Sequence, residues 1–272
     1  MKILPQNAEM IVQGPGKDGL LKHIETAART CYQSGSLAKE GSAERMVDAL
    51  IRNQHTAMLE HGTIYFKMPE EEYQLMPIAV SILIEKWGSC VLKDEVCYGS
   101  IDYRTYMSNE DLRDCIRKFE CEPEKHHERR ITIRMTTNLQ VATDFLRHRR
   151  MSFAMESTRY CAYDKERFGN ELSFISPVWL DGRDIHDAGL REWANAMQDA
   201  EIHYMNMRKL GWPQEQCSQA LPKATKTTLV MTGYESFWDH FFDLRYYEKT
   251  GNVHPQVKEI ATMVYNLIKT DR

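Results

Sequence analysis

The sequence predicts an α+β protein. Runs typical of strands and runs typical of helices follow one another irregularly, without the repeated strand–helix–strand order that builds a parallel sheet. Hydrophobic residues form 42% of the 272 residues and aromatic residues 10%, a composition that can bury a sizeable core. No tract rich in Pro, Gly and Ser divides the chain. We therefore expect a single domain over residues 1–272, with an insertion at about residues 69–128.

In the N-terminal half, β-branched and aromatic runs predict strands, and apolar residues three or four apart predict helices. Strands are expected at 8–12, 63–68, 90–92 and 96–98, and helices at 20–29, 46–51 and 109–119, the last beginning at an asparagine cap. An apolar run at 78–84 and a charge-rich stretch at 120–130 complete the insertion. His126 and His127 lie in the charged stretch, where we expect them to be exposed.

The C-terminal half contains the same two patterns. Strands are expected at 131–136, 172–175 and 226–231, the last ended by Gly233. Helices are expected at 138–146, 184–210, 234–244 and 254–268, and a shorter helix is expected between Pro213 and Leu221-Pro222. The run at 184–210 is long and amphipathic, and the run at 234–244 is rich in aromatic residues.

A glycine motif near the N-terminus matches the dinucleotide-binding fingerprint. Gly14, Gly16 and Gly19 follow a predicted strand and open a predicted helix. The fingerprint requires a second parallel strand within about thirty residues. Another helix-like run follows instead, and no β-branched apolar strand precedes it. The motif is therefore interpreted as a glycine-rich turn before a helix, with a Rossmann-type dehydrogenase as the alternative.

Charge and cysteine content argue against several classes of protein. The formal net charge is −4 and the isoelectric point about 6.2, which disfavours a general nucleic-acid or membrane-surface binder. Neither a charged and apolar N-terminal leader nor an apolar run of about 18 residues is visible, so no signal peptide or membrane span is predicted. The seven cysteines are odd in number and form no C-x-x-C pair, which favours reduced thiols in the cytoplasm over a zinc site or a disulfide framework.

Two histidines before the first long strand raise the question of a metal site. His55 and His61 stand six residues apart, which does not place both on one face of a helix, and no third ligand is close in sequence. We therefore predict no metal site and assign both histidines to hydrogen-bonding or ring-stacking roles.

The densest group of cations lies between Arg147 and Tyr160. The run Arg-His-Arg-Arg-Met-Ser-Phe-Ala-Met-Glu-Ser-Thr-Arg-Tyr holds four arginines, one histidine and two serines. It follows a helix-like apolar segment, and charge at the end of a buried element costs free energy unless an anion meets it. The planar fork of arginine suits phosphate or carboxylate, so the run predicts a pocket for a phosphorylated ligand. One alternative is a solvated helix C-terminus. Another is an RNA-binding loop, which the acidic chain disfavours.

This run resembles the signature of the flavin-dependent thymidylate synthases. Arg147-His148-Arg149, followed after seven residues by Ser157, forms the core of the signature, and Ser152, Arg159 and Tyr160 extend it. Supporting matches lie along the chain at 27–32, at His55 with Glu60 and His61, at Leu221-Pro222, and at His240-Phe241 with Leu244-Arg245. The matches span most of the chain apart from about residues 69–128.

The resemblance implies an enzyme that makes dTMP from dUMP. In this family 5,10-methylenetetrahydrofolate supplies the carbon, and FAD reduced by NADPH supplies the hydride. The implied fold, a flavin-dependent thymidylate synthase domain of the thymidylate synthase-complementing type, packs helices around a central, mostly antiparallel sheet. The implied assembly is a homotetramer whose active sites are shared between subunits, without nucleic acid or a membrane as partner.

By resemblance, two groups of residues bind the ligands. FAD is expected at His55, Arg147, His148, Arg149, Tyr234, Glu235, Ser236 and His240. The nucleotide dUMP is expected at Asp144, Arg147, Glu156, Ser157, Thr158, Arg159 and Arg245. An arginine can clamp a phosphate and a serine hydroxyl can hydrogen-bond it, while Glu156 and Thr158 are expected to offer backbone N–H groups.

Arg245 matches the residue thought to act on the uracil ring. A guanidinium near N3 lowers the pKa of that nitrogen, and the resulting anion pushes electron density toward C5, which must become nucleophilic. Because the guanidinium stays protonated, Arg245 is expected to act as the catalytic electrostatic stabiliser. The alternative is a residue that only caps its own helix. No protein nucleophile is required, and Cys161 and Cys217 are interpreted as small buried residues.

Several positions depart from the family pattern. Ala154 and Met155 stand where polar residues are usual, Asp144 where a Gln is frequent, and Ser218 where an Arg is common; a Ser often occupies the position of Cys31. The missing phosphate and flavin contacts support an alternative function, a catalytically impaired nucleotide- and flavin-binding homologue. Lys223 or Lys226 is a candidate to replace the charge that is missing at Ser218.

Overall fold

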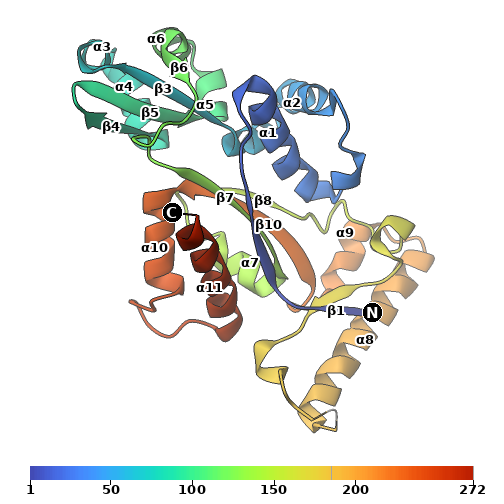
Figure 1. Ribbon diagram of the computed structural model, residues 1–272. Helices are drawn as coiled ribbons and strands as arrows, with labels where there is room; N and C mark the ends of the chain where they lie inside the picture. Colours follow the sequence, from blue (N-terminus) through green and yellow to red (C-terminus); the bar gives the residue numbers. More distant parts are fainter. Residues whose placement is uncertain (185, 272) are drawn as a thin grey trace.

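The computed structural model describes residues 1–184 and 186–271 (Figure 1). The predicted α+β class is confirmed, because helices pack around two four-stranded sheets that are antiparallel throughout. A separate two-stranded sheet pairs its strands in parallel.

The described strands are β1 (Lys2–Leu4), β2 (Asn7–Ile11), β3 (Thr63–Pro69), β4 (Gly88–Lys93), β5 (Val96–Asp102), β6 (Glu120–Cys121), β7 (Arg130–Asn138), β8 (Ser152–Met155), β9 (Ser173–Ile175) and β10 (Lys226–Tyr234). The described α-helices are α1 (Gly16–Tyr32), α2 (Ser42–Arg52), α3 (Glu70–Gln74), α4 (Ile78–Trp87), α5 (Tyr103–Ser108), α6 (Glu110–Ile116), α7 (Leu139–Phe145), α8 (Ala188–Lys209), α9 (Gln214–Cys217), α10 (Glu235–Arg245) and α11 (Pro255–Thr270). Short 3-10 helices lie at η1 (Gly35–Leu37), η2 (Thr56–His61), η3 (Arg117–Phe119), η4 (Glu166–Phe168), η5 (Val178–Leu180) and η6 (Ser218–Ala220).

The central sheet has the strand order β2-β7-β10-β8. Its longest pairing joins β7 and β10 over nine residues, from Arg130 opposite Tyr234 to Asn138 opposite Lys226. The expected strand end at Gly233 is wrong, because β10 continues to Tyr234. Glycine serves there for packing, since a Cβ on Gly233 would lie 3.2 Å from the side chain of Met151.

One face of the central sheet is covered by α7, α10 and α11 (Figure 1). Leu229 and Met231 point from β10 into this core, where they meet the large rings of α10. The rings of Phe145 on α7 and Phe241 on α10 pack edge to face with centroids 5.0 Å apart. This contact fixes the C-terminal end of α7 against α10.

The opposite face of the central sheet packs on α1 and η2 through a chain of buried hydrogen bonds. His23 lies 2.9 Å from the hydroxyl of Thr132, that hydroxyl lies 2.8 Å from Thr232, and His61 Nδ1 lies 2.7 Å from Thr232. The predicted hydrogen-bonding role of His61 is therefore confirmed. Burial, and to a smaller extent the nearby Arg130, lowers the pKa of His23 to about 4 and that of His61 to about 3.

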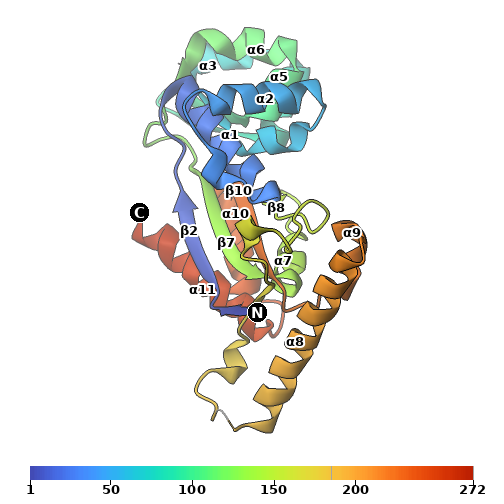
Figure 2. The same ribbon diagram turned by 90° about the vertical axis from the view of Figure 1, so that its right-hand side faces the viewer.

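The expected insertion at about 69–128 lies between β3 and β7 in the sequence. Together with β3 it forms a second sheet in the order β4-β5-β3-β6 (Figures 1 and 2). Phe66, Ile84 and Ile101 lie at the centre of its core, and Leu20 and Ile24 of α1 belong to the same cluster. The insertion therefore packs directly on the first helix. Its assignment to one domain with the rest of the chain stays a prediction.

Three expectations for the insertion are wrong. His127 is buried, because its Nε2 lies 3.1 Å from the carbonyl of Phe66. Cys90 and Cys97 are not free thiols but form a disulfide between the neighbouring strands β4 and β5. Asn109 occupies the expected N-cap position of α6, but its side chain donates to the carbonyl of Thr105 at 2.7 Å and does not form the cap hydrogen bond. The burial of His127 depends on which strand becomes its neighbour, which the local sequence does not specify.

The helix expected at 184–210 is observed as α8, which extends away from the central sheet (Figure 2). Its N-cap is Asp187, which accepts from the N–H of Leu190 at 2.9 Å; residue 185 lies outside the described residues. Tyr204 packs from α8 against a small core that also buries Cys161 and Cys217, as interpreted from the sequence. In the described ranges, none of the helices combines the length and apolar character needed to cross a membrane.

The buried histidines predict how stability depends on pH. Between pH 6.5 and about 4, His23 and His61 stay neutral in the folded protein, whereas the same residues take up protons in the unfolded chain, where their pKa is near 6.5. The free energy of unfolding should therefore fall with falling pH over this range, by about 1.4 kcal/mol per pH unit for each histidine. Urea unfolding of the wild type and of His61→Gln between pH 7 and 5 measures the effect.

The matched control is His203→Gln, at an exposed position of α8. We expect His61→Gln to lose less stability on acidification than the wild type, and His203→Gln to follow the wild type. Equal pH slopes for all three proteins would show that the buried histidines do not resist protonation.

Candidate functional site

Five predicted site residues meet where α7 and α10 end. We call Asp144, Arg147, His148, His240 and Arg245 the Arg245 cluster. Arg245 Nε donates to His148 Nε2 at 3.1 Å, and Arg245 Nη2 donates to the backbone carbonyl of Asp144 at 3.2 Å. The Asp144 carboxylate lies 3.6 Å from Arg147. Two motifs about a hundred residues apart in sequence therefore form one polar site.

His148 is a neutral hydrogen-bond acceptor in this cluster. Burial lowers the pKa of His148 to about 4, with smaller contributions from the neighbouring Arg245 and His240. Because Nε2 accepts from Arg245, the ring proton of the neutral form lies on Nδ1. The ring of Phe241 packs 5.0 Å from His148 and closes one side.

The guanidinium of Arg245 is directed away from its own helix. Burial lowers the pKa of Arg245, against the raising effect of the Asp144 carboxylate, yet an arginine remains a cation at neutral pH. Its described hydrogen bonds go to Asp144 and His148 and not to carbonyls of α10. The helix-capping alternative for Arg245 therefore does not describe these contacts.

Arg149 and Arg150 line a separate space, which we call the signature cavity. It has a volume of about 800 Å³ and also borders Ser152, Gly233 and Tyr234. Arg150 lies 4.0 Å above the ring of Phe237. At the base of the signature cavity, Arg130 donates to the carbonyl of Glu60 at 2.6 Å and to the hydroxyl of Ser152 at 3.3 Å.

The start of α10 contains three further predicted flavin contacts. The Tyr234 ring borders the signature cavity, while its hydroxyl accepts from Ser100 of the insertion at 3.1 Å. The Glu235 N–H donates to the carbonyl of Arg129 at 2.9 Å. The Ser236 N–H donates to the carboxylate of Glu128 at 3.1 Å. The sequence did not reveal Glu128 as a ligand of this helix N-terminus, because it lies 108 residues earlier.

The predicted phosphate-binding residues follow the C-terminal end of β8. Ser157 Oγ accepts from the N–H of Arg159 at 3.3 Å, and the Arg159 guanidinium forms an exposed ion pair with Glu215 at 3.0 Å. Thr158 is half-buried beside them, and His55 is exposed at the start of η2. The strand Ser152–Met155 separates this group from the Arg245 cluster within one chain.

The family of the chain follows from comparison with known proteins. The family described as thymidylate synthase complementing protein matches residues 83–271, which is more than half of the chain. The chain belongs to this family. The family predicted from the signature is therefore confirmed, and the antiparallel central sheet agrees with the fold that the resemblance implied.

Individual relatives match a part of the chain. The flavin-dependent thymidylate synthase of Synechocystis sp. is 28% identical over 141 residues, which cover 50% of this chain and 65% of that protein. The enzyme of the same name from Pyrococcus furiosus is 28% identical over 128 residues, which cover 46% of this chain and 49% of that protein. The chain therefore spans about half to two thirds of the length of these curated relatives.

Among solved structures, a UMP/dUMP methylase, PolB from Streptomyces cacaoi bound with 5-Br dUMP, is similar over 99% of this chain and 93% of its own. The TM-score of this alignment is 0.48 and the sequence identity is 16%.

In this member of the family, Glu156 is an internal residue. Its carboxylate accepts from Lys226 at 2.7 Å, from the Tyr163 hydroxyl at 3.0 Å and from the N–H of Thr228 at 3.2 Å. The expectation that Glu156 offers its backbone N–H to a ligand is wrong, since that N–H donates to the carbonyl of Thr228 at 2.8 Å. Burial beside Glu156 also raises the pKa of Tyr163 strongly.

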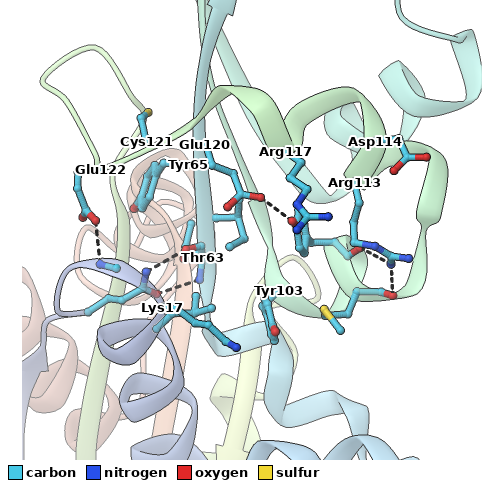
Figure 3. Close-up of a pocket in the computed structure, with 16 residues that line it drawn as sticks. Lys17, Thr63, Tyr65, Tyr103, Arg113, Asp114, Arg117, Glu120, Cys121 and Glu122 are labelled. Carbon is cyan, nitrogen blue, oxygen red and sulfur yellow. Dashed lines mark hydrogen bonds between the residues drawn. The ribbon is translucent and has the colours of Figure 1, made fainter. Parts of the chain in front are cut away.

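The glycine motif lines a different cavity, of about 810 Å³, which Figure 3 shows. The Gly16 N–H at the start of α1 donates to the carboxylate of Glu122 at 2.8 Å, so this helix terminus already faces an anion. β2 before the motif runs antiparallel to its neighbour β7. The parallel strand–helix–strand unit that a Rossmann site requires is therefore missing here, and the dehydrogenase alternative is wrong.

Charge also distinguishes the two cavities. The glycine-motif cavity places Lys17, Arg113 and Arg117 against three carboxylates, those of Asp114, Glu120 and Glu122 (Figure 3). Glu120 accepts from the hydroxyl of Tyr106 at 2.5 Å, and Arg113 donates to the carbonyl of Met107 at 2.5 Å. Its charges balance in number, which does not favour a phosphate there.

The buried Lys226–Glu156 pair predicts a stability effect. Lys226→Ala would leave the Glu156 carboxylate buried without its cation, and we expect a loss of about 3 kcal/mol in the free energy of unfolding. The exposed Lys223→Ala is the matched control, for which we expect little change. Adding Glu156→Gln to Lys226→Ala should restore part of the loss in urea unfolding. If both lysine variants had the stability of the wild type, the pair would not be a structural requirement.

The glycine motif gives a second prediction. A Cβ on Gly19 would lie 2.1 Å from the backbone of Gly14, so Gly19→Ala should cost about 3 kcal/mol of stability. Gly16 has φ +65° but no heavy atom within 4 Å of a built Cβ, so Gly16→Ala should cost only about 1 kcal/mol. Calorimetry and titration with FAD measure both effects. We expect flavin affinity to be unchanged in the folded variants, and a selective loss of dinucleotide binding in Gly16→Ala would contradict the turn interpretation.

Proposed function

We propose that this chain is a flavin-dependent thymidylate synthase. The reaction converts dUMP into dTMP, with 5,10-methylenetetrahydrofolate as carbon donor and FAD reduced by NADPH as hydride carrier. The observation that supports this most directly is the hydrogen bond of 3.1 Å between Arg245 and His148, which joins the two motifs of the family into one site. The family to which the chain belongs supplies the chemical context.

The cations of the signature fit a cofactor that carries phosphates. Arg149 has no carboxylate partner among the residues that the structure describes, and the side chain of Arg147 is 71% exposed. Such guanidinium groups bind phosphate oxygens through paired N–H donors. In this proposal FAD is held by Arg147, His148 and Arg149, with contributions from His55, Tyr234, Glu235, Ser236 and His240. When bound, FAD supplies hydride transfer.

Arg245 acts on the pyrimidine in this proposal. His148 and the Asp144 carbonyl accept two of its N–H groups and so hold the planar fork in one orientation. A fixed cation beside uracil N3 and its neighbouring carbonyl stabilises negative charge on the ring, which increases electron density at C5. Since His148 is neutral, it orients Arg245 without competing for the same negative charge.

The nucleotide phosphate is assigned to Ser157, Thr158 and Arg159, and the assembly to a homotetramer. These three residues lie beyond one end of β8, and the Arg245 cluster lies beyond the other. In the proposed assembly, a nucleotide contacts one group from one copy of the chain and the other group from a second copy. This separation supports the shared active sites that the family resemblance implies.

A second candidate is a homologue that binds nucleotide and flavin but turns over slowly or not at all. Two cations near the nucleotide end already have carboxylate partners, since Arg159 pairs with Glu215 at 3.0 Å and Lys226 with Glu156 at 2.7 Å. Ser218, where the family often has an arginine, donates its hydroxyl proton to the carbonyl of Glu215 at 2.8 Å. These contacts reduce the charge that is available for a phosphate.

The deciding experiment is an absorbance spectrum of the pure protein, followed by NADPH addition without oxygen, with and without dUMP. We expect a flavin spectrum that bleaches, faster when dUMP is present, and dTMP formation once methylenetetrahydrofolate is added. Bleaching without dTMP would favour the second candidate. A colourless protein that cannot be reconstituted with FAD would refute both candidates.

The variant Arg245→Lys separates binding from chemistry in the same assay. Lysine keeps the charge but loses the planar fork that contacts His148 and Asp144. We expect dTMP formation to fall by at least about a hundredfold, because the loss of one preorganised transition-state donor costs about that much. Flavin content should stay close to that of the wild type.

A further inference from the structure

The insertion forms one wall of the signature cavity. Leu83, Lys86 and Trp87 of α4 and Arg104 of α5 border the same space of about 800 Å³ as Arg149 and Arg150. None of the residues that the signature predicts lies on this wall. A ligand held by the signature arginines on this side of the molecule would therefore contact the insertion as well.

The signature cavity has an excess of positive charge. Its two carboxylates are both engaged: Glu60 pairs with Arg104 at 2.5 Å, and Asp102 caps α5 by accepting from Thr105 at 2.9 Å. Lys86, Arg149 and Arg150 have no carboxylate partner in the part of the chain that the structure describes. An excess of three cations around one space, in a chain with net charge −4, fits a ligand with at least two negative charges.

The rim of the cavity also offers aromatic surface. Trp87 is 50% exposed, and the ammonium group of Lys86 lies 5.0 Å from its ring. On the side of the central sheet, Phe237 packs under Arg150 at 4.0 Å. A half-exposed indole next to cations without a carboxylate partner suits a nucleotide, because the ring stacks on the base while the cations meet the phosphates.

We infer that the insertion binds the nucleoside-diphosphate half of a dinucleotide cofactor, with Trp87 stacked on the base and Lys86 paired with the diphosphate together with Arg149 and Arg150. The inference rests on the proposed function, which brings two dinucleotides to this chain, FAD and NADPH. It assigns a ligand-binding role to residues outside the signature. It also gives the insertion a role in choosing between a dinucleotide and a mononucleotide.

The test compares FAD with FMN, which has the same flavin ring but lacks the second nucleotide. The full chain is stripped of flavin, and both ligands are titrated into wild type, Trp87→Ala, Trp87→Phe and Lys86→Ala, with binding followed by flavin fluorescence. Trp87→Ala should weaken FAD about tenfold, the loss expected for one stacking contact, and leave FMN unchanged. Trp87→Phe should restore most of the FAD affinity, and Lys86→Ala should reduce its dependence on salt.

A second arm identifies the dinucleotide. If Trp87→Ala leaves FAD binding unchanged but raises the KM for NADPH, while reduction by dithionite stays normal, the occupant is the nicotinamide dinucleotide. If Trp87→Ala weakens the affinity for FAD and leaves the KM for NADPH unchanged, the occupant is FAD. Equal losses for FAD and FMN, or no change for either dinucleotide, would overturn the inference.

Trp212→Ala is the matched control, because Trp212 is 49% exposed and does not border the cavity. We expect it to bind FAD like the wild type. The proposed function fails in a different way. If the wild type binds FAD with a contribution from Trp87 but makes no dTMP, the inference stands and the synthase proposal is refuted. A wild type that binds neither dinucleotide would refute both.

Discussion

The antiparallel pairing of β7 with β10 is the contact on which the candidate site depends. Over nine residues it sets Asn138 opposite Lys226 and Arg130 opposite Tyr234, so α7 and α10 begin at opposite ends of the same two strands. Both helices then run back along one face of the sheet, and their C-terminal ends meet. The hydrogen bond from Arg245 to His148 is a consequence of this register. A slip by one residue would turn Leu229 and Met231 to the other face and separate the two helices.

The two faces of the β7–β10 pair differ in chemistry, and both contribute to the position of the candidate site. Toward α10 the strands bury apolar side chains, whose removal from water supplies the main driving force. Toward α1 they bury Thr132 and Thr232, whose hydroxyls are satisfied by His23 and His61. This second face holds η2, and with it the carbonyl of Glu60 that accepts from Arg130 beneath the signature cavity. The polar network therefore positions the base of the cavity.

Long periodic elements could be predicted from the sequence, and contacts between distant segments could not. The central strands and the long helices follow from local patterns. β8 has no such pattern, since its four residues lie inside a motif dominated by charge and form a strand only because β10 pairs with them. His127 and Glu156 are misjudged for the same reason, because their partners Phe66 and Lys226 lie far away in the sequence.

The distribution of arginine partners separates structural from functional cations. Arg29 is bound inside the protein by Glu25 at 2.7 Å, and Arg130 is held by backbone carbonyls at the base of the signature cavity. Arg147, Arg149 and Arg150 are exposed, and the contacts of Arg147 with Asp144 and of Arg150 with Phe237 contribute little stability at the surface. They lie before β8 and Arg159 lies after it, and the four residues of this strand span roughly 13 Å. In the proposed homotetramer, a ligand that needs both groups contacts the residues before β8 in one copy and the residues after β8 in a second copy.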